Sequence, residues 1–261
     1  MQKKELEQIL LILKKLKNYL HSFVHYVITI IYPDVCLSCG KILDSEGFCV
    51  NCWKELVFIK KPYCFLCGRP LDINSQMGLI CADCINKKYY FDRVFSVFVY
   101  NRVIAKAIFR FKFNRKTFLS KFFAKFLNNK LKECNEKIDF IVPIPMNVMK
   151  LRNRGYNQAV LLAKDLSKMV KIPCIYDLII KTKNTKAQSS LSHKERKFNL
   201  KLAFKLNEKY KDIVKNKNIL IVDDVFTTGS TANECSKILK KSGAVGRIFV
   251  LTIAKTVHRQ K

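Results

Sequence analysis

The chain has 261 residues and 49% of them are hydrophobic, so it can bury a core and is not an intrinsically disordered protein. Its formal net charge of +29, from 49 Lys and Arg against 20 Asp and Glu, favours anionic partners such as nucleic acid or phosphorylated metabolites. The same excess of Lys, with abundant Asn, Ile and Phe, is also what an AT-rich genome would produce.

The first segment, residues 1–33, has the pattern of one amphipathic helix that ends at Pro33. Polar residues interrupt its second half and leave it short of the ~20 apolar residues of a membrane span, so we expect no transmembrane span. It would pack on its own protein or a partner, or lie on a membrane surface. No secretory cleavage pattern is visible, which predicts a cytoplasmic protein. The helical stripe consists of Leu6, Ile9, Leu13, Leu16, Leu20, Phe23, Val27 and Ile30.

Residues 34–88 are rich in cysteine and poor in apolar runs, so we expect bound metal to stabilise them. Two C-x2-C pairs complete a tetrahedral four-thiolate site, and four pairs predict two structural Zn2+ ions, with sequential pairing favoured over a cross-braced arrangement. An iron–sulfur cluster or redox dithiols are the alternatives, because C-x2-C alone supports either. The eight candidate ligands are Cys36, Cys39, Cys49, Cys52, Cys64, Cys67, Cys81 and Cys84.

Two glycines support this interpretation, because Gly40 and Gly68 each follow a C-x2-C pair where a knuckle turn needs a residue tolerant of positive φ. The remaining three cysteines are Cys134, Cys174 and Cys235, and two of them lie on apolar faces of predicted elements. We expect these three to be core residues.

Residues 89–261 alternate between strand-like and helix-like segments, which predicts an α/β domain with a twisted, mostly parallel sheet and helices on both faces. A polar stretch over 181–200 is expected to be a mobile loop. The expected strands are 91–100, 138–142, 174–180, 219–222 and 248–253, and the expected helices are about 104–111, 117–133, 159–170 and 232–239.

The segment after the strand 219–222 combines two carboxylates with a run of hydroxyl residues and a glycine that opens a helix. Ligands of open α/β sheets bind at the carboxyl ends of strands, and a helix N-terminus offers N–H groups to a phosphate. The carboxylates can accept hydrogen bonds from a ribose diol and face a metal ion. The predicted ribose-phosphate site is Asp223, Asp224, Val225, Phe226, Thr227, Thr228, Gly229, Ser230 and Thr231.

In the alternative interpretation, the carboxylates only end a strand and the hydroxyls only cap a helix. Two adjacent carboxylates at a buried strand end are costly without ligands, and capping needs only one hydroxyl, so the binding site is favoured. Neither G-x-x-x-x-G-K-[ST] nor G-x-G-x-x-G occurs, which argues against a nucleoside triphosphatase or a dinucleotide enzyme.

Residues 222–231 resemble the phosphoribosyl pyrophosphate (PRPP) signature of type I phosphoribosyltransferases, and nearly all of the chain after Pro33 is similar to the ComF family. The resemblance implies a double zinc ribbon joined to a phosphoribosyltransferase domain, PRPP with Mg2+ as ligand, and a role in DNA uptake during natural competence. It rests on the cysteine pairs, the carboxylate site, Val142–Pro145, Leu151–Ala159, and on Thr185, Gln188, Leu191, Arg196, Asn199, Ala203 and Phe204.

The resemblance also places a pyrophosphate loop at 143–149 and a flexible loop that closes over PRPP at 181–200. Lys181 and Lys183 stand where the family more often has Arg, and Ala187 precedes Gln188 where Pro is usual. For two of the loop residues, Arg152 and Arg154, a solvated basic turn is the alternative. The candidate loop residues are Pro145, Lys150, Arg152, Arg154, Gln188 and Arg196, and no catalytic residue is identified.

Two functions follow from these patterns. The first is a competence protein that handles single-stranded DNA, with PRPP or a related ribose-phosphate as ligand and a competence helicase or other proteins as candidate partners. The alternative is a soluble phosphoribosyltransferase of nucleotide salvage. Phe109 and Phe113 could stack on bases, whereas Phe111 falls on an apolar helix face. The basic residues expected to contact DNA are Lys106, Arg110, Lys112, Arg115, Lys116, Lys150, Arg152 and Arg154.

Overall fold

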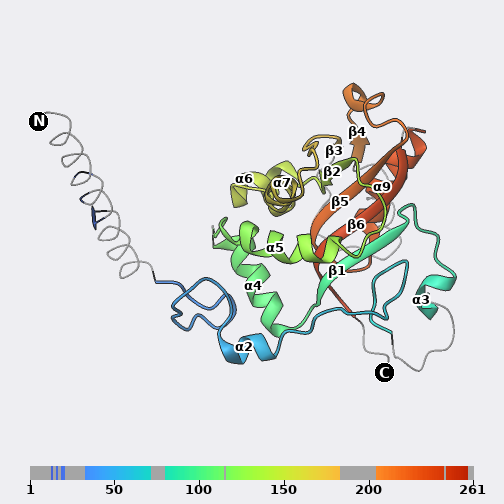
Figure 1. Cartoon of the computed structure of the whole chain (residues 1–261). Coiled ribbons are helices and arrows are strands. Elements are labelled where there is room, and N and C mark those ends of the chain that lie inside the picture. The colour runs from blue at the N-terminus through green and yellow to red at the C-terminus, as the bar shows by residue number, and fades with distance from the viewer. Residues whose placement is uncertain are drawn as a thin grey trace, which may run out of the picture. The chain divides into compact units, whose positions relative to one another are not determined.

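The computed structural model describes residues 13, 16, 19–20, 33–71, 80–114, 116–182, 204–243 and 245–257. The chain divides into two compact units, residues 1–54 and residues 55–261, and Figure 1 shows their elements. The expected helix over 6–32 and the expected loop over 181–200 fall almost entirely outside the described residues. In the part of the chain that is described, no helix is both long and apolar enough to cross a membrane.

The first unit contains one knuckle turn and the short helix α2 (Val50–Lys54). Val35 and Ile42 form an antiparallel bridge across the turn, and the N–H of Cys36 donates to the carbonyl of Lys41 at 2.7 Å. Gly40 has a φ of 86°, so the expected left-handed residue after the first cysteine pair is confirmed.

A four-stranded parallel sheet forms the centre of the second unit. Its strands lie in the order β1 (Arg93–Val99), β6 (Val245–Lys255), β5 (Lys217–Phe226) and β2 (Phe140–Pro143). Every neighbouring pair is parallel, and β5 and β6 form the long buried centre. The expected α/β class with a mostly parallel sheet is therefore confirmed.

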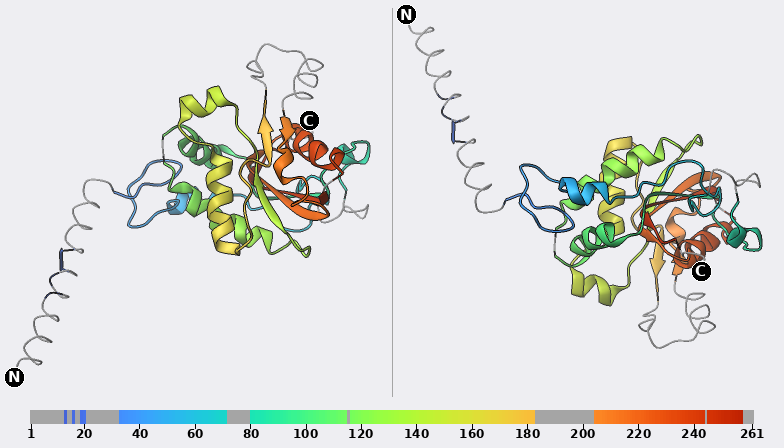
Figure 2. Two further views of the ribbon diagram at one scale, coloured as in Figure 1. Left: turned by 90° about the horizontal axis from the view of Figure 1, so that it is seen from above. Right: turned by 90° about the horizontal axis from the view of Figure 1, so that it is seen from below.

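Helices cover both faces of this sheet, as Figures 1 and 2 show. One face carries α4 (Arg102–Phe113), α5 (Leu119–Leu131) and α7 (Gln158–Val170), with α5 packed on β1 and β6 and α7 on β5 and β2. The other face carries α9 (Ser230–Lys241), which packs on β6. Large, fully buried side chains between the sheet and these helices include Phe95, Phe98, Phe111, Phe123, Leu162 and Leu166.

A small antiparallel pair, β3 (Ile179–Lys181) and β4 (Phe204–Leu206), lies beside the main sheet and is followed by the 3-10 helix η2 (Glu208–Tyr210). The expected strand over 174–180 is shorter than predicted. Cys174 forms only an isolated parallel bridge with Ile141, and a turn separates it from β3.

Two short helices complete the described elements, α3 (Ala82–Ile85) and α6 (Val148–Arg154). The sequence predicted a loop where α6 lies. Asn147 caps this helix by accepting from the N–H groups of Met149 and Lys150, and none of the seven residues of α6 is buried. With no apolar side facing the core, α6 has no hydrophobic periodicity from which it could be predicted.

Candidate ribose-phosphate site and zinc centres

The eight paired cysteines gather into two groups of four, Cys36, Cys39, Cys49 and Cys52, and Cys64, Cys67, Cys81 and Cys84. Within each group the four sulfur atoms all lie within 4.8 Å of one another, as a tetrahedral zinc site requires. Adjacent pairs in the sequence share a group, so the sequential pairing is confirmed and a cross-braced arrangement is excluded.

Backbone N–H groups point at two of these sulfur atoms and favour the thiolate form that binds a metal cation. The N–H of Cys49 points to Sγ of Cys36 and that of Cys81 to Sγ of Cys64, each at 3.3 Å. The hydrogen bond from Cys67 and backbone N–H groups lower the pKa of the Cys64 thiol, and burial opposes them. Four thiolates leave no open coordination position, so the donor set fits structural zinc.

The second cysteine group belongs to the core of the α/β unit. Its four cysteines share one buried cluster with Phe91 and Val94 beside the sheet and with Phe226 at the end of β5. Gly68 has a φ of 69°, and a Cβ atom there would lie 2.9 Å from the carbonyl oxygen of Val94. The knuckle thus packs directly against β1, and only glycine fits at this contact.

The two predicted carboxylates lie inside β5, which continues to Phe226 rather than ending at Val222 as expected. Side chains of adjacent strand residues point to opposite faces, and the two aspartates accordingly have different surroundings. Asp223 lines a hollow beside the start of α9. Asp224 is 8% exposed, and its Oδ2 lies 2.7 Å from Nζ of Lys112 on α4.

Asp223 has an unusual acidity. Its Oδ1 accepts a hydrogen bond from the N–H of Asp224 at 2.8 Å. This bond and the positive charge of Lys112 both lower the pKa of Asp223. Burial and, second, the negative charge of Asp224 outweigh both and raise the pKa of Asp223 to about 7. A carboxylate that is costly to ionise favours a ligand that brings hydroxyl donors or a cation.

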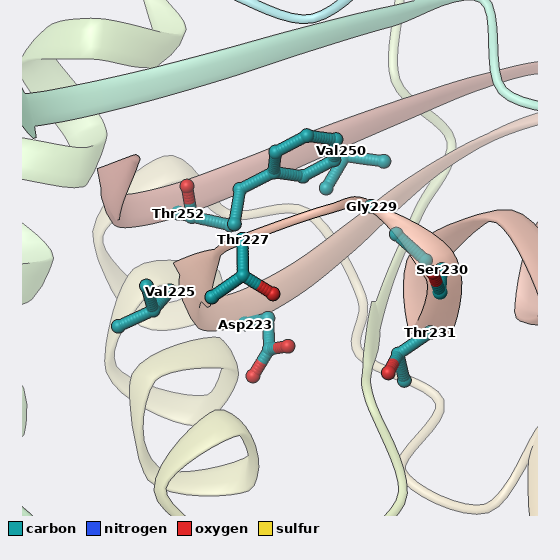
Figure 3. Close-up of a pocket in the computed structure, with 10 residues that line it drawn as sticks. Asp223, Val225, Thr227, Gly229, Ser230, Thr231, Val250 and Thr252 are labelled. Carbon is teal, nitrogen blue, oxygen red and sulfur yellow. The ribbon is translucent and has the colours of Figure 1, made fainter. Parts of the chain in front are cut away.

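The hollow beside Asp223 holds about 280 Å³ of empty space, some of it open to solvent. Figure 3 shows Asp223 at the end of β5 and, across the hollow, Ser230 and Thr231 at the start of α9. Thr228 and Ser230 hydroxyls are 2.8 Å apart. The hollow is lined by Asp223, Val225, Phe226, Thr227, Gly229, Ser230, Thr231, Ala232, Val250 and Thr252.

Gly229 lets the chain turn from β5 into α9 at this point. Its φ is 78°, and a Cβ atom would lie 2.5 Å from Cζ of Phe226. The tight turn leaves the first N–H groups of α9 without intrahelical partners next to the hydroxyls. Carboxylate, hydroxyls and helix N-terminus together offer the acceptors and donors that a sugar carrying a phosphate would use.

The predicted loop residues Pro145, Lys150, Arg152 and Arg154 lie after β2, and the last three of them are on α6 rather than in a loop. Burial lowers the pKa of Lys181 on β3, and the positive charge of Lys150 lowers it further. Gln188 and Arg196 lie outside the described residues.

Helices α4 and α6 share an aromatic and basic surface. The rings of Phe109 and Phe113 are 4.8 Å apart and both are exposed, and the guanidinium of Arg154 lies 4.6 Å from the Phe113 ring centre. Phe111 is fully buried, which confirms its expected place in the core. We call Lys106, Phe109, Arg110, Phe113, Lys150, Arg152 and Arg154 the α4–α6 surface.

Lys112 was expected on that surface and instead forms an ion pair with Asp224, while Arg115 lies outside the described residues. The Lys112–Asp224 ion pair could not be predicted because α4 and β5 are far apart in the sequence. Nothing in the sequence distinguishes Lys112 from the other basic residues of the helix as a partner for Asp224. Helical spacing from the buried Phe111 indicates only that Lys112 borders the core.

Comparison with known proteins adds relatives for both parts of the chain. Residues 27–85 match the double zinc ribbon domain family and residues 118–260 match the phosphoribosyl transferase domain family. Competence protein F of Haemophilus influenzae is 33% identical over 215 residues, which cover 80% of this chain and 91% of the relative.

Two further relatives span similar lengths. DNA utilization protein YhgH of Escherichia coli is 29% identical over 219 residues, covering 81% of this chain and 93% of the relative. Competence protein ComFC of Bacillus subtilis is 27% identical over 219 residues, covering 81% of this chain and 85% of the relative.

Proposed function

We propose that this chain, which belongs to the ComF family of competence proteins, binds PRPP or a related ribose-phosphate and acts in DNA uptake by handling single-stranded DNA in the cytoplasm. The first part rests on the site at the end of β5, where Asp223, Ser230 and the start of α9 surround one hollow, with the Thr228 hydroxyl 2.8 Å from that of Ser230. The second part rests on the names of the relatives and on the α4–α6 surface.

The hollow suits the two ends of a ribose 5-phosphate. The phosphate would lie at the N-terminus of α9, where N–H groups and the hydroxyls of Thr228 and Ser230 can donate to it. The ribose diol would donate to Asp223, whose carboxylate would thereby gain hydrogen-bond donors that stabilise its ionised form. This juxtaposition of carboxylate and phosphate-binding loop is the observation that carries the proposal.

A divalent ion fits the same place. Mg2+ binds one or two carboxylates together with substrate phosphates and water, and Asp223 supplies a carboxylate beside the proposed ribose position. Lys150 on α6 and Lys181 on β3 would supply positive charge to the diphosphate of PRPP. When bound, Mg2+ would neutralise that diphosphate, and the chain's own residues would orient the sugar.

The α4–α6 surface has the chemistry of a single-strand binding surface. Phe109 and Phe113 expose two rings side by side, the Arg154 guanidinium lies against Phe113, and Lys106, Lys150 and Arg152 are exposed on the same two helices. Bases of any sequence can stack on aromatic rings while Lys and Arg contact phosphates. The overall charge of +29 would further attract a polyanion.

Fluorescence anisotropy with a labelled single-stranded oligonucleotide tests the DNA part. We expect binding with little sequence preference that weakens as salt increases, because counterions are released from the phosphates. The double variant Lys150→Ala, Arg152→Ala should bind more weakly, with a log-log salt slope reduced by about 0.7 per lost contact. The double variant Lys215→Ala, Lys217→Ala is the matched control. Both residues are exposed, and Lys217 begins β5 at the amino-terminal end of the parallel strands, whereas α6 follows the carboxyl end of β2.

The alternative is a salvage phosphoribosyltransferase, which the phosphoribosyl transferase domain itself favours. A screen for pyrophosphate release from PRPP with purine and pyrimidine bases separates the two functions. Turnover with a base, together with no salt-sensitive DNA binding near physiological ionic strength, would replace the competence role by the salvage role.

A further inference from the structure

We infer that Lys112 is a built-in counterion of the ribose-phosphate site: it neutralises Asp224, the neighbour of Asp223 on the opposite face of β5, so that a sugar-phosphate can bind beside Asp223 without a divalent metal ion to offset the second carboxylate. The inference rests on the proposed function of the site and concerns its ligand requirements. A metal ion would then be needed only for the diphosphate of a ligand such as PRPP.

The Lys112–Asp224 pair is short and largely buried. Nζ and Oδ2 are 2.7 Å apart, and the two side chains are 25% and 11% exposed. Among the described residues, Asp224 is the one acidic partner of Lys112. Charges removed from water in this way interact more strongly than a surface pair, and loss of one partner leaves the other uncompensated.

Lys112 is held in position by its neighbours on α4. Phe111 is fully buried and packs against Phe123, and its carbonyl accepts the hydroxyl of Tyr156 at 2.5 Å. Tyr156 lies between α6 and α7, so the last turn of α4 is fixed to the segment that carries Lys150. Lys112 therefore reaches Asp224 from a rigid support rather than from a free surface.

The charge balance of the site follows from this arrangement. With Lys112 present, the ionised pair Asp223 and Asp224 carries one uncompensated negative charge, and without it two. A ribose 5-phosphate dianion is repelled less in the first case. In the second case the site would have to recruit Mg2+ before the same ligand could bind.

Isothermal titration calorimetry with ribose 5-phosphate tests the inference, because this probe lacks a diphosphate that binds Mg2+ strongly by itself. No chelator is added, so the zinc centres stay intact. The wild-type protein should bind with nearly the same affinity with and without added Mg2+. Lys112→Met should lose about tenfold or more in affinity without Mg2+ and recover most of it with Mg2+.

Two further variants keep the result interpretable. Lys112→Arg should retain Mg2+-independent binding, which also serves if Lys112→Met does not fold. Lys125→Met, at an exposed lysine on the neighbouring helix α5, should behave as the wild type. The inference would be overturned if Lys112→Met and the wild type bound ribose 5-phosphate equally well without Mg2+, or if the wild type required Mg2+ to bind it. Either result would leave the proposed site itself standing. A wild type that binds no ribose 5-phosphate under either condition would overturn the proposed site as well.

Discussion

Asp223 and Asp224 are neighbours in the chain and yet have different roles in the structure. Because β5 continues through both, Asp223 points to the hollow beside α9 and Asp224 to Lys112. From the sequence, both were expected to face the ligand together. The structure leaves Asp223 as the carboxylate that is open to a sugar.

The acidity of Asp223 predicts a pH-dependent stability. Its pKa is about 7 in the folded protein against an ordinary value of 3.8, so between these values the folded state keeps a proton that the unfolded state has lost. The wild type therefore loses stability as pH rises through this window. Asp223→Asn lacks that loss, and its melting temperature should exceed that of the wild type most at pH above about 7.

Thermal melts of both proteins between about pH 4 and pH 8 measure this difference. It should shrink as pH falls toward the ordinary pKa of aspartate. Asp212→Asn, at an exposed position, is the control and should show no such trend. A difference that is constant across the pH range would show that Asp223 ionises normally.

At the scale of elements, the sequence predicted best those segments that bury one face. Ile104, Ala107, Ile108 and Phe111 were expected on the apolar side of a helix, and all four are buried on α4. The strand over 219–222 was predicted but cut short, because the carboxylates that follow it do not read as strand residues. The helix α6 was missed because all of its residues lie at the surface.

The two zinc knuckles are alike in sequence and differ in how they are embedded. The first belongs to the compact unit of residues 1–54, whereas the second shares a buried cluster with the sheet of the other unit. Spacing identified both ligand sets and their pairing. It could not indicate that the second knuckle packs on β1 and on the end of β5, since those contacts are distant in the chain.

This difference predicts unequal effects of losing each zinc ion. The purified protein should contain close to two zinc ions by mass spectrometry. Replacing Cys36 and Cys39 by Ser should remove one ion and leave the main unfolding transition of the α/β unit nearly unchanged. Replacing Cys64 and Cys67 by Ser should remove the other and lower that transition clearly, because the core loses its metal link. Equal effects of both changes, or iron in place of zinc, would contradict this account.

At the scale of the whole molecule, the chain joins a strong positive charge to the small site proposed for a ribose-phosphate. The two properties meet at α4, where Lys112 pairs with Asp224 while Phe109 and Phe113 lie on the outer surface. Composition alone could suggest an anionic partner but could not say which lysines serve the site and which the surface. That distinction requires the packing of α4 against β5.

Calorimetric titration of the full chain with PRPP and Mg2+ tests the ribose-phosphate site most directly. We predict one binding site per chain and a loss of affinity of about tenfold or more in Thr228→Ala, which removes a phosphate donor. Lys217→Met changes the first residue of β5, at the other end of the strand from the proposed site, and should bind PRPP as the wild type does. Absence of binding by the wild type, or equal affinity of the wild type and Thr228→Ala, would contradict the assignment of this loop as the ligand site.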